Sequence, residues 1–385
     1  MGRVSRSTRI AGDGRATNVP VMPREVPMDA SARQRIRYLR TSDGVQLAWA
    51  EVGRGPLLIK AANWLSHLEF EWESRLWRHW LRFFAERFRF VRHDERGCGM
   101  TDWDVEDLSF ERRVADLEEL VAALGASEPF ILLGMSQGAS VAAAYSVRHP
   151  ERVSHLVVYG GYAAGWAVRG DPLEKREYRA LAELIRLGWG RDHPAFVQAF
   201  TTRFVPEGTP EQVVWFNELC RRSASPAMAA ALLESRGTVD VRPLLPRVSV
   251  PTLVLHARGD AVVPLSEGRR IAAAIPGARF VELDSRNHIL LEHEPAWRRF
   301  QEAVAEFTGV AAAAAAGEGA FATLTAREHE ILALLCEGLS NAQIAQRLAI
   351  SDKTVRNHLS HLFDKLGVWT RAQAIVFAHE RGLRA

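Results

Sequence analysis

Short apolar runs alternate with longer stretches of helical periodicity from about residue 35 to residue 308. Apolar runs of this length, bounded by turn residues, are typical of β-strands. The strand candidates, in chain order, are Ile36–Tyr38, Val45–Val52, Pro56–Lys60, Phe88–Val91, Phe130–Leu133, Val153–Val158, Thr252–His256 and Arg279–Leu283. Because strands and helices alternate, the pattern predicts an α/β domain over residues 35–308.

The strand pattern is interrupted between Gly165 and Arg242. This stretch is rich in Ala, Leu and Arg at helical spacing, and it separates two strand candidates. An insertion of this kind predicts a helical cap over the sheet, at about residues 165–242.

The composition changes sharply after residue 308. Residues 309–319 hold six consecutive alanines (Ala311–Ala316) between glycines, which predicts a flexible linker, with a continuous helix as the alternative. From residue 320 to residue 385 the pattern is helical throughout, which predicts a separate all-α domain. Residues 1–34 are rich in Arg, Gly and Pro and are expected to be a flexible arm, with Met22 or Met28 as alternative starts.

Composition places the chain among ordinary globular proteins, with 47% apolar and 25% charged residues. The formal net charge of +3 is too small to indicate a nucleic-acid partner. Three widely separated cysteines match no metal or disulfide spacing and are expected to be buried thiols. We expect neither a metal nor a cofactor. No apolar run reaches the ~18–20 residues that span a bilayer, and the start lacks the apolar core of a signal peptide. We therefore expect a cytoplasmic protein without a membrane partner.

Capping signals and apolar spacing predict four helices in residues 320–385. The pairs Thr325–Glu328 and Ser340–Gln343 are capping boxes, which open the first two helices. Ser351 is the expected N-cap of the third helix, and the fourth is expected from about residue 370 to residue 380. Eight Lys and Arg against six Asp and Glu give this region little net charge.

The third helix has two distinct faces. Val355, Leu359 and Leu362 fall on one apolar face. The opposite polar face consists of Lys353, Arg356, Asn357, Ser360 and His361. Polar donors on a helix that follows a short helix and a tight turn suit the DNA major groove, and a solvated surface is the alternative.

The whole of residues 320–385 resembles the LuxR-type helix-turn-helix domain. The matching segments are Leu324–Glu328, Gly338–Asn341, Ile344–Ala345, Leu348–Ser351, Thr354–Val355, His358, Lys365–Gly367 and Arg371–Ala372. The resemblance implies double-stranded DNA as the partner, base contacts from the third helix and a dimer interface on the fourth. The residues carried over by position are Arg356, Asn357 and Ser360 for base contacts, and Asn341, Lys353 and Thr354 for phosphate contacts. An apolar face of Ala372, Ile375, Val376 and Ala378 supports a homodimer on a two-fold symmetric site.

A glycine-flanked serine stands between a strand candidate and an alanine-rich helix. The strand Phe130–Leu133 runs into Gly134-Met-Ser136-Gln-Gly138, and the helix covers about residues 139–147. Glycines permit the sharp turn that raises a nucleophilic serine above a sheet, and the helix N-terminus with the N–H of Gln137 would stabilise an oxyanion.

Two further residues complete a candidate catalytic triad. Asp260 follows the strand Thr252–His256, and His288 follows the strand Arg279–Leu283. The serine, acid and histidine thus all come at carboxyl ends of strands and in the order Ser, acid, His, so they can supply the nucleophile, the base and the acid that orients the base. Asp284 is the rival acid, although it is close in sequence to His288.

The span from about residue 35 to residue 308 resembles the α/β-hydrolase family. Besides the serine motif, the run from Asp94 through Arg96-Gly97-Cys-Gly99 to Asp102 is similar to the family's D-x-R-G-x-G-x-S-D turn. The resemblance implies a mainly parallel sheet with a helical cap, and a turn whose Asp and Arg brace loops near the site.

The sequence departs from the family after the third strand, where relatives usually carry His-Gly. This chain has Lys60-Ala-Ala-Asn63-Trp64 instead. Since the oxyanion donor is a main-chain group, the N–H of Asn63 or Trp64 is expected to act with that of Gln137. The aromatic residues Trp64, Phe70, Trp72, Trp77 and Trp80 either pack the core or line an apolar ligand pocket.

Three functions are compatible with this sequence. The first is a DNA-binding transcription regulator whose hydrolase-like domain senses a small molecule, with little or slow hydrolysis. The second is an active serine hydrolase for an ester, lactone or amide, which carries a DNA-binding tail. The third is an inactive hydrolase fold that serves as a dimerisation scaffold, which the missing His-Gly suggests.

Overall fold

The computed structural model describes residues 34–169, 171–189, 194–310, 324–366, 368 and 370–380. The predicted arm (apart from Gln34) and residues 311–319 of the predicted linker lie outside these ranges. The strands, in chain order, are β1 (Arg35–Arg40), β2 (Gln46–Val52), β3 (Leu57–Ala61), β4 (Arg89–His93), β5 (Phe130–Met135), β6 (Val153–Tyr159), β7 (Thr252–Ala257) and β8 (Arg279–Leu283). Each predicted strand is therefore present, with its ends shifted by at most a few residues.

The strands form one mainly parallel sheet in the order β1-β2-β4-β3-β5-β6-β7-β8. The strands from β4 to β8 in this order pair in parallel, while β2 pairs antiparallel with both β1 and β4. The predicted mainly parallel α/β fold is confirmed. Since β5 lies in the interior of the sheet between β3 and β6, the turn that follows it is surrounded by the loops after its neighbours.

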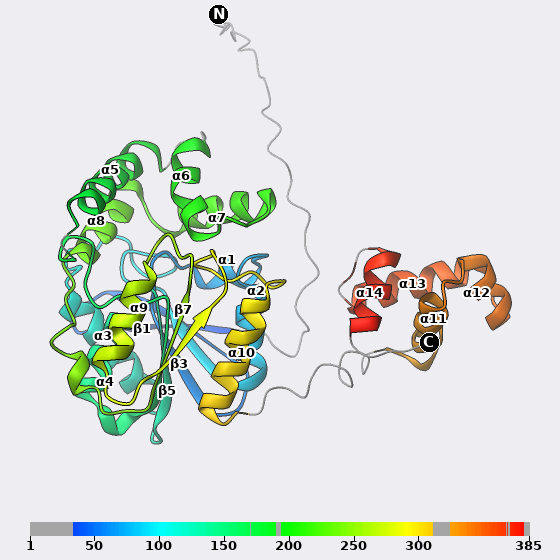
Figure 1. The fold of residues 1–385 in the computed structure, drawn as a ribbon, viewed down its shortest axis with the longest axis horizontal. Coiled ribbons are helices and arrows are strands. Elements are labelled where there is room, and N and C mark those ends of the chain that lie inside the picture. Colours follow the sequence, from blue (N-terminus) through cyan, green and yellow to red (C-terminus); the bar gives the residue numbers. More distant parts are fainter. Residues whose placement is uncertain are drawn as a thin grey trace, which may run out of the picture.

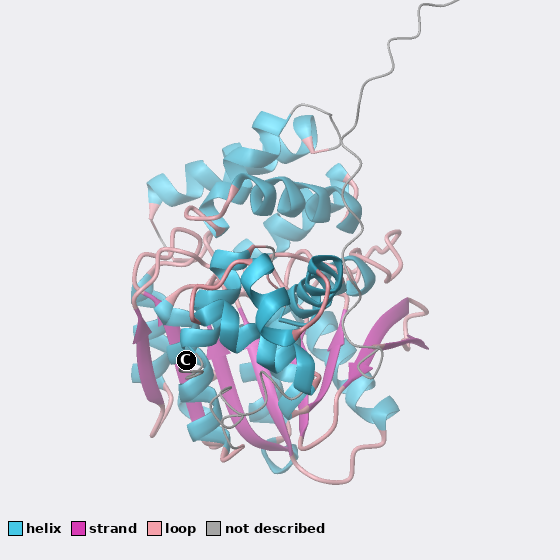
Figure 2. Cartoon of the chain, turned by 90° about the vertical axis from the view of Figure 1, so that its right-hand side faces the viewer, coloured by secondary structure: helices cyan, strands magenta, loops and turns pink. Residues whose placement is uncertain are grey.

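Helices cover both faces of this sheet (Figure 1, Figure 2). One face carries α2 and α10, and the other carries α3, α4 and α9, each face having its own buried apolar cluster. The bounds are α1 (Leu68–Trp72), α2 (Arg78–Arg87), α3 (Phe110–Leu124), α4 (Gly138–Arg148), α9 (Leu265–Ala274) and α10 (Pro295–Thr308). None of the described helices is both long enough and apolar enough to cross a membrane.

Four helices between β6 and β7 lie together above one end of the sheet (Figure 1). They are α5 (Pro172–Gly188), α6 (Pro194–Phe204), α7 (Pro210–Ser223) and α8 (Pro226–Gly237). Three of them begin with proline in the first turn after a side chain that caps the helix, namely Asp171, Thr209 or Ser225. Proline needs no backbone hydrogen bond in the first turn, so these starts are sharply defined.

The C-terminal residues form a small helical unit of their own. Its helices are α11 (Ala326–Cys336), α12 (Asn341–Leu348), α13 (Asp352–Leu366) and α14 (Arg371–Glu380). Both predicted capping boxes are present, and the Ser351 hydroxyl accepts from the N–H of Thr354 at 3.1 Å. The turn between α12 and α13 passes through Ala349, which has a left-handed φ of 52°. This residue ends α12 and redirects the chain into α13.

Candidate active site and DNA-binding unit

Ser136 occupies a strained turn between β5 and α4. Its φ is 52°, which is uncommon for a residue other than glycine. The neighbouring glycines make the turn possible: an added Cβ would lie 2.6 Å from the Ala139 Cα at Gly134, and 2.8 Å from the Ala62 carbonyl oxygen at Gly138. The Ser136 N–H donates to the Tyr159 carbonyl at 2.9 Å, which fixes the turn to the end of β6.

His288 and Asp260 form a short hydrogen bond. The distance from His288 Nδ1 to Asp260 Oδ2 is 2.6 Å, and both side chains are buried. The other oxygen of Asp260 accepts from the N–H groups of Val262 and Val263 at 2.8 and 2.9 Å. Burial by itself would raise the pKa of Asp260, but the charge and hydrogen bond of His288 hold this pKa below its ordinary value. An ionised carboxylate can only accept, so Nδ1 of His288 is the donor and Nε2 is left as a base.

The rival acid, Asp284, lies elsewhere. Its side chain is 89% exposed, and its Oδ1 lies 3.4 Å from Arg258 Nη1. The acid that contacts His288 is therefore Asp260.

Two glycines after β6 border both Ser136 and His288. An added Cβ at Gly160 would lie 3.0 Å from His288 Cε1, and one at Gly161 would lie 3.5 Å from the Ser136 carbonyl oxygen. The backbone of His288 is held by the Phe204 carbonyl, which accepts its N–H at 2.8 Å. The carboxyl ends of β5, β6, β7 and β8 thus bring the three predicted triad residues to one edge of the sheet.

The loop after β3 packs against the serine turn, although it lacks His-Gly. The Ala62 N–H donates to Nε2 of His93, at the end of β4, at 3.2 Å. Burial lowers the pKa of His93 to about 3, so its ring stays neutral and able to accept. Sequence reasoning missed this histidine support. With Ala62 engaged, the N–H groups of Asn63 and Trp64 remain the oxyanion candidates beside that of Gln137, which is the N-cap residue of α4.

A pocket of about 580 Å³, its mouth included, lies between the serine turn and the cap. The side of the pocket opposite to the cap is lined by Trp64, Ser136 and Gln137. For Trp64, this agrees with the predicted alternative of a ligand pocket. Trp77 and Trp80, at the start of α2, do not line the pocket and are buried in the apolar cluster on the face of the sheet that α2 covers. The cap contributes mainly apolar and aromatic side chains, among them Trp166, Tyr178, Leu181, Phe200, Phe204 and Leu233, together with arginines.

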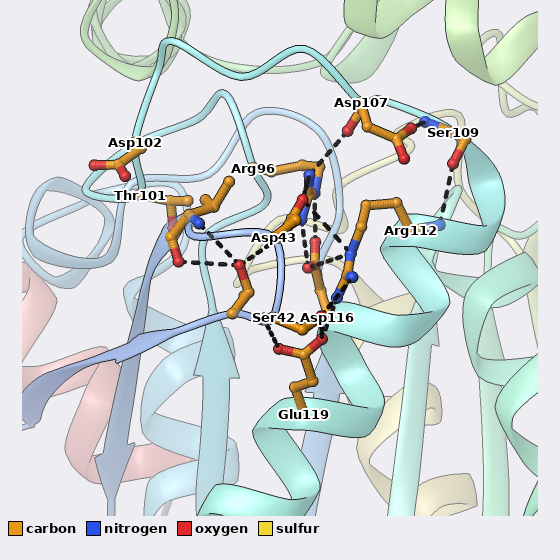
Figure 3. Close-up of polar contacts among 12 residues, drawn as sticks. Ser42, Asp43, Arg96, Thr101, Asp102, Asp107, Ser109, Arg112, Asp116 and Glu119 are labelled. Carbon is orange, nitrogen blue, oxygen red and sulfur yellow. Dashed lines mark hydrogen bonds and ion pairs between the residues drawn. The ribbon is translucent and has the colours of Figure 1, made fainter.

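The turn after β4 braces the loops around this site, as predicted. Arg96 is fully buried, and its Nε and Nη2 each donate to Asp116 at 2.7 Å (Figure 3). Its Nη1 donates to Asp43 and to the Asp107 carbonyl, both at 2.9 Å. Asp94 accepts from Ser66 and from two backbone N–H groups. These side chains tie β1–β2, α1 and α3 together and do not line the pocket.

The C-terminal unit exposes the polar face predicted for α13. Val355, Leu359 and Leu362 are buried in the helical core. The exposed residues are Lys353, Arg356, Asn357, Ser360 and His361, while Thr354 and Asn341 are half-buried. Arg356 Nη2 lies 2.9 Å from Asp352, and the Asn341 side chain accepts from Arg371 at 3.3 Å. The two predicted sets of DNA contacts therefore lie on the side of α13 opposite to the core, and at the start of α12.

One part of the predicted dimer face is wrong. Ala378 is completely buried against the core of its own unit, so it is not available to a partner. Ala372 and Val376 are exposed on α14, and Ile375 is half-buried beside them. The sequence pattern could not separate these positions, because six of the seven residues 372–378 are small or apolar and leave more than one possible inward face.

Comparison with known proteins matches each part of the chain to a family. The family described as "alpha/beta hydrolase fold" matches residues 70–295, which is more than half of the chain. This chain belongs to the α/β-hydrolase fold family. The family described as "Bacterial regulatory proteins, luxR family" matches residues 322–378. The hydrolase domain is therefore fused to a LuxR-type DNA-binding domain, as the sequence predicted.

Individual relatives follow the same division. The AB hydrolase superfamily protein YisY of Bacillus subtilis is 26% identical over 257 residues, which cover 65% of this chain and 91% of YisY. A hydrolase of Pseudomonas aeruginosa of known structure is 26% identical, with a TM-score of 0.58 over 71% of this chain and 98% of its own. The activator DevR/DosR of Mycobacterium tuberculosis is 53% identical over 57 residues, 15% of this chain and 26% of DevR/DosR.

Proposed function

We propose that this protein is a one-component transcription regulator, in which a small molecule bound above Ser136 changes how the LuxR-type domain binds DNA. The observation that carries the proposal is a capped pocket lined by Ser136, with the His288–Asp260 pair at the same edge of the sheet, in a chain that also holds a DNA-binding domain. A ligand can alter DNA affinity only if it binds the DNA-competent and DNA-incompetent states unequally. A pocket built partly from the cap and partly from the sheet offers that difference.

We further propose that the bound molecule is an ester, lactone or amide, which the site hydrolyses. In this mechanism Nε2 of His288 takes the proton of the Ser136 hydroxyl while the oxygen attacks the carbonyl carbon. Asp260 orients the ring and stabilises its charged form. The oxyanion faces the N–H of Gln137 and that of Asn63 or Trp64. His288 then protonates the leaving group, and water releases the acyl group from Ser136. Turnover would end the signal.

On DNA, we propose a homodimer that binds a two-fold symmetric site. Its interface is formed by Ala372, Ile375 and Val376 of α14. The proposed base contacts come from Arg356, Asn357 and Ser360, with His361 on the same polar face, and the proposed phosphate contacts come from Asn341, Lys353 and Thr354. A regulator of this kind must be in the compartment that holds the chromosome, so we propose that the protein is cytoplasmic.

The test compares wild type, Ser136→Ala and Ser140→Ala with a fluorophosphonate label and a panel of p-nitrophenyl esters and lactones. Ser140 is a matched control, because it lies near the start of α4, the helix that follows Ser136. Its side chain is buried, and its hydroxyl donates to the Tyr162 carbonyl at 2.9 Å. Label and turnover that vanish only in Ser136→Ala would establish Ser136 as the nucleophile.

Absence of label and turnover in folded wild-type protein would reject hydrolysis and leave ligand sensing. Compounds that raise the melting temperature would then be tested for their effect on DNA affinity, measured by fluorescence anisotropy. If no bound compound changed the affinity for DNA, the regulatory proposal would fail and the domain would be a scaffold.

A further inference from the structure

Arg236, near the end of α8, is a buried cation in the wall of the pocket. Its side chain is almost completely buried, and it lines the same pocket as Ser136. The guanidinium carbon lies 5.1 Å from the centre of the Trp64 ring. A buried guanidinium is costly unless carboxylates or hydrogen-bond acceptors surround it.

The surroundings of Arg236 supply too few acceptors. Its Nη2 forms an ion pair with Glu95, but its Nε and Nη1 meet no acceptor among the residues that the structure describes. Arg113 shares the same carboxylate, with Nη1 3.4 Å from Glu95, and its own Nε and Nη2 are also without acceptors in the described ranges. Two buried guanidinium groups thus share one carboxylate, and the cluster carries an excess positive charge.

The other arginines of the pocket wall differ from Arg236. Arg169 pairs with Glu174 and donates to the Ala164 carbonyl at 3.2 Å. Arg203 donates twice to the Ala261 carbonyl and is more exposed. No Asp or Glu is found among the described residues that line the pocket. Burial lowers the pKa of Arg236 even though Glu95 opposes this shift, which agrees with a cation that lacks negative charge around it.

We infer that the pocket accepts an ester or lactone that also carries a carboxylate, and that Arg236 binds this carboxylate while Ser136 faces the scissile carbonyl. The inference rests on the proposed function, since it names the substrate class of that site. A carboxylate would give Nη1 of the guanidinium the acceptor that it lacks and would balance the excess charge. Between the two ends the wall is apolar, with Trp64, Phe200 and Leu233, so the connecting part of the substrate is a hydrocarbon chain or ring.

The test uses pairs of p-nitrophenyl esters that differ in one charge. Each pair consists of the mono-p-nitrophenyl ester of adipic, suberic or sebacic acid and the same compound with its free acid methylated. For the best chain length, wild type should prefer the acid by about 10- to 100-fold in kcat/KM. Arg236→Met should reduce this ratio to about 1, and Arg236→Lys should retain part of it, because a lysine keeps the charge without the planar fork.

Arg186→Met is the matched control. Arg186 also lies on the cap, but it is paired with Glu183 and Glu234 away from the pocket. For Arg186→Met, the ratio of kcat/KM for the acid to that for its methyl ester should stay within about twofold of wild type, since exposed charges act weakly over distance. Fluorophosphonate labelling and the melting temperature establish that each variant is folded. Equal ratios for Arg236→Met and wild type, or an equal loss in Arg203→Met, would overturn the assignment of Arg236.

A binding measurement separates this inference from the proposed hydrolysis. Calorimetric titration of Ser136→Ala protein with 4-phenylbutyrate and with its neutral amide needs no turnover. Tighter binding of the acid, lost in the Ser136→Ala/Arg236→Met double variant, supports the carboxylate site even if hydrolysis fails. Hydrolysis of the methyl esters without any preference for the acids would overturn the carboxylate site and leave the proposed function in place.

Discussion

The Cα of Gly160 lies directly against the imidazole of His288. A methyl group added there would lie 3.0 Å from Cε1 and 3.3 Å from Nδ1 of the ring, and 3.7 Å from Asp260 Oδ2. The two distances to the ring are tighter than ordinary van der Waals contacts, so a side chain at this position requires the histidine to shift by a few tenths of an ångström. The residue after β6 therefore sets the position of the base, although it contributes no functional group.

Gly160→Ala is expected to lower esterase activity by up to about tenfold, because even a small displacement of the base from its productive position slows proton transfer. Gly125→Ala is the matched control: Gly125 has φ 59° against 57° for Gly160, and an added Cβ there would meet nothing within 4 Å. Both variants should lose about 1 kcal/mol of stability from the left-handed backbone. Similar activity losses in both would mean that strain, and not contact with His288, is responsible.

Asp260→Asn is expected to reduce kcat by about 10³- to 10⁴-fold while the protein remains folded, because an amide no longer holds the imidazole in the reactive tautomer. Asp284→Asn removes the same charge from an exposed side chain and should change kcat by less than about twofold. Ester hydrolysis and circular dichroism of both variants provide the measurement. A comparable loss in Asp284→Asn would contradict the assignment of the acid.

His79 should make the fold sensitive to mild acid. Burial lowers the pKa of His79 to about 4, although the Leu290 carbonyl, which accepts from its Nε2, opposes the shift. The unfolded chain takes up this proton near pH 6.5. Stability is therefore full above about pH 6.5 and declines as the pH falls toward 4, by up to ~1.4 kcal/mol per pH unit.

The measurement is urea unfolding at several pH values for wild type and His79→Gln. Glutamine can donate to the same carbonyl but does not titrate, so the variant should lose less stability than wild type between about pH 6.5 and pH 4. Parallel profiles for the two proteins would show that His79 does not contribute.

Arg96→Met should cost about 3–5 kcal/mol of unfolding free energy, because it leaves the buried Asp116 without its bidentate partner. Arg148→Met removes an arginine that pairs with Glu111 and Glu118 near the surface, and should cost less than about 1 kcal/mol. Chemical denaturation measures both values. If the two costs were equal, the turn after β4 would not brace the fold in the way Figure 3 indicates.

On DNA, Arg356 and Lys353 should behave differently. Arg356→Ala is expected to weaken binding to a selected operator by about 1–3 kcal/mol and to relax specificity at one position, as for a residue that reads a base edge. Lys353→Ala is expected to weaken binding to all sequences and to reduce the salt slope by about 1. Anisotropy titrations over a range of salt concentrations distinguish them. An unchanged affinity in Arg356→Ala would place the reading face elsewhere.

The sequence predicts the local features of this protein better than its long-range contacts. The eight strands of the sheet and the two capping boxes of the C-terminal unit could be predicted, because apolar spacing and capping act over a few neighbouring residues. The position of β3 between β4 and β5 could not, since strand order depends on packing between distant segments. The same holds for the site: Ser136, Asp260 and His288 carry recognisable motifs, which local patterns reveal.

The contacts around these residues have no such local pattern. Arg236 is an ordinary arginine in an alanine-rich helix until the fold brings it to Glu95, 141 positions away. His93 ends an apolar strand, and only the fold places its ring under Ala62. In the sequence, Gly160 looks like an ordinary turn residue. Only the fold brings this residue, which follows β6, against His288, which follows β8. In each case the function of the residue depends on a neighbour that is remote in the chain.

Ser136 and Ala349 share a backbone property, since both have φ 52°, and among the described residues they are the non-glycine positions with positive φ. One stands at the candidate nucleophile and the other at the turn before the helix that faces DNA. Each conformation costs about 1 kcal/mol or more. The sequence with the highest thermal stability is therefore not the sequence with the highest activity. Selection for thermal resistance alone would favour glycine at both positions, and at the first it would remove the hydroxyl on which the chemistry depends.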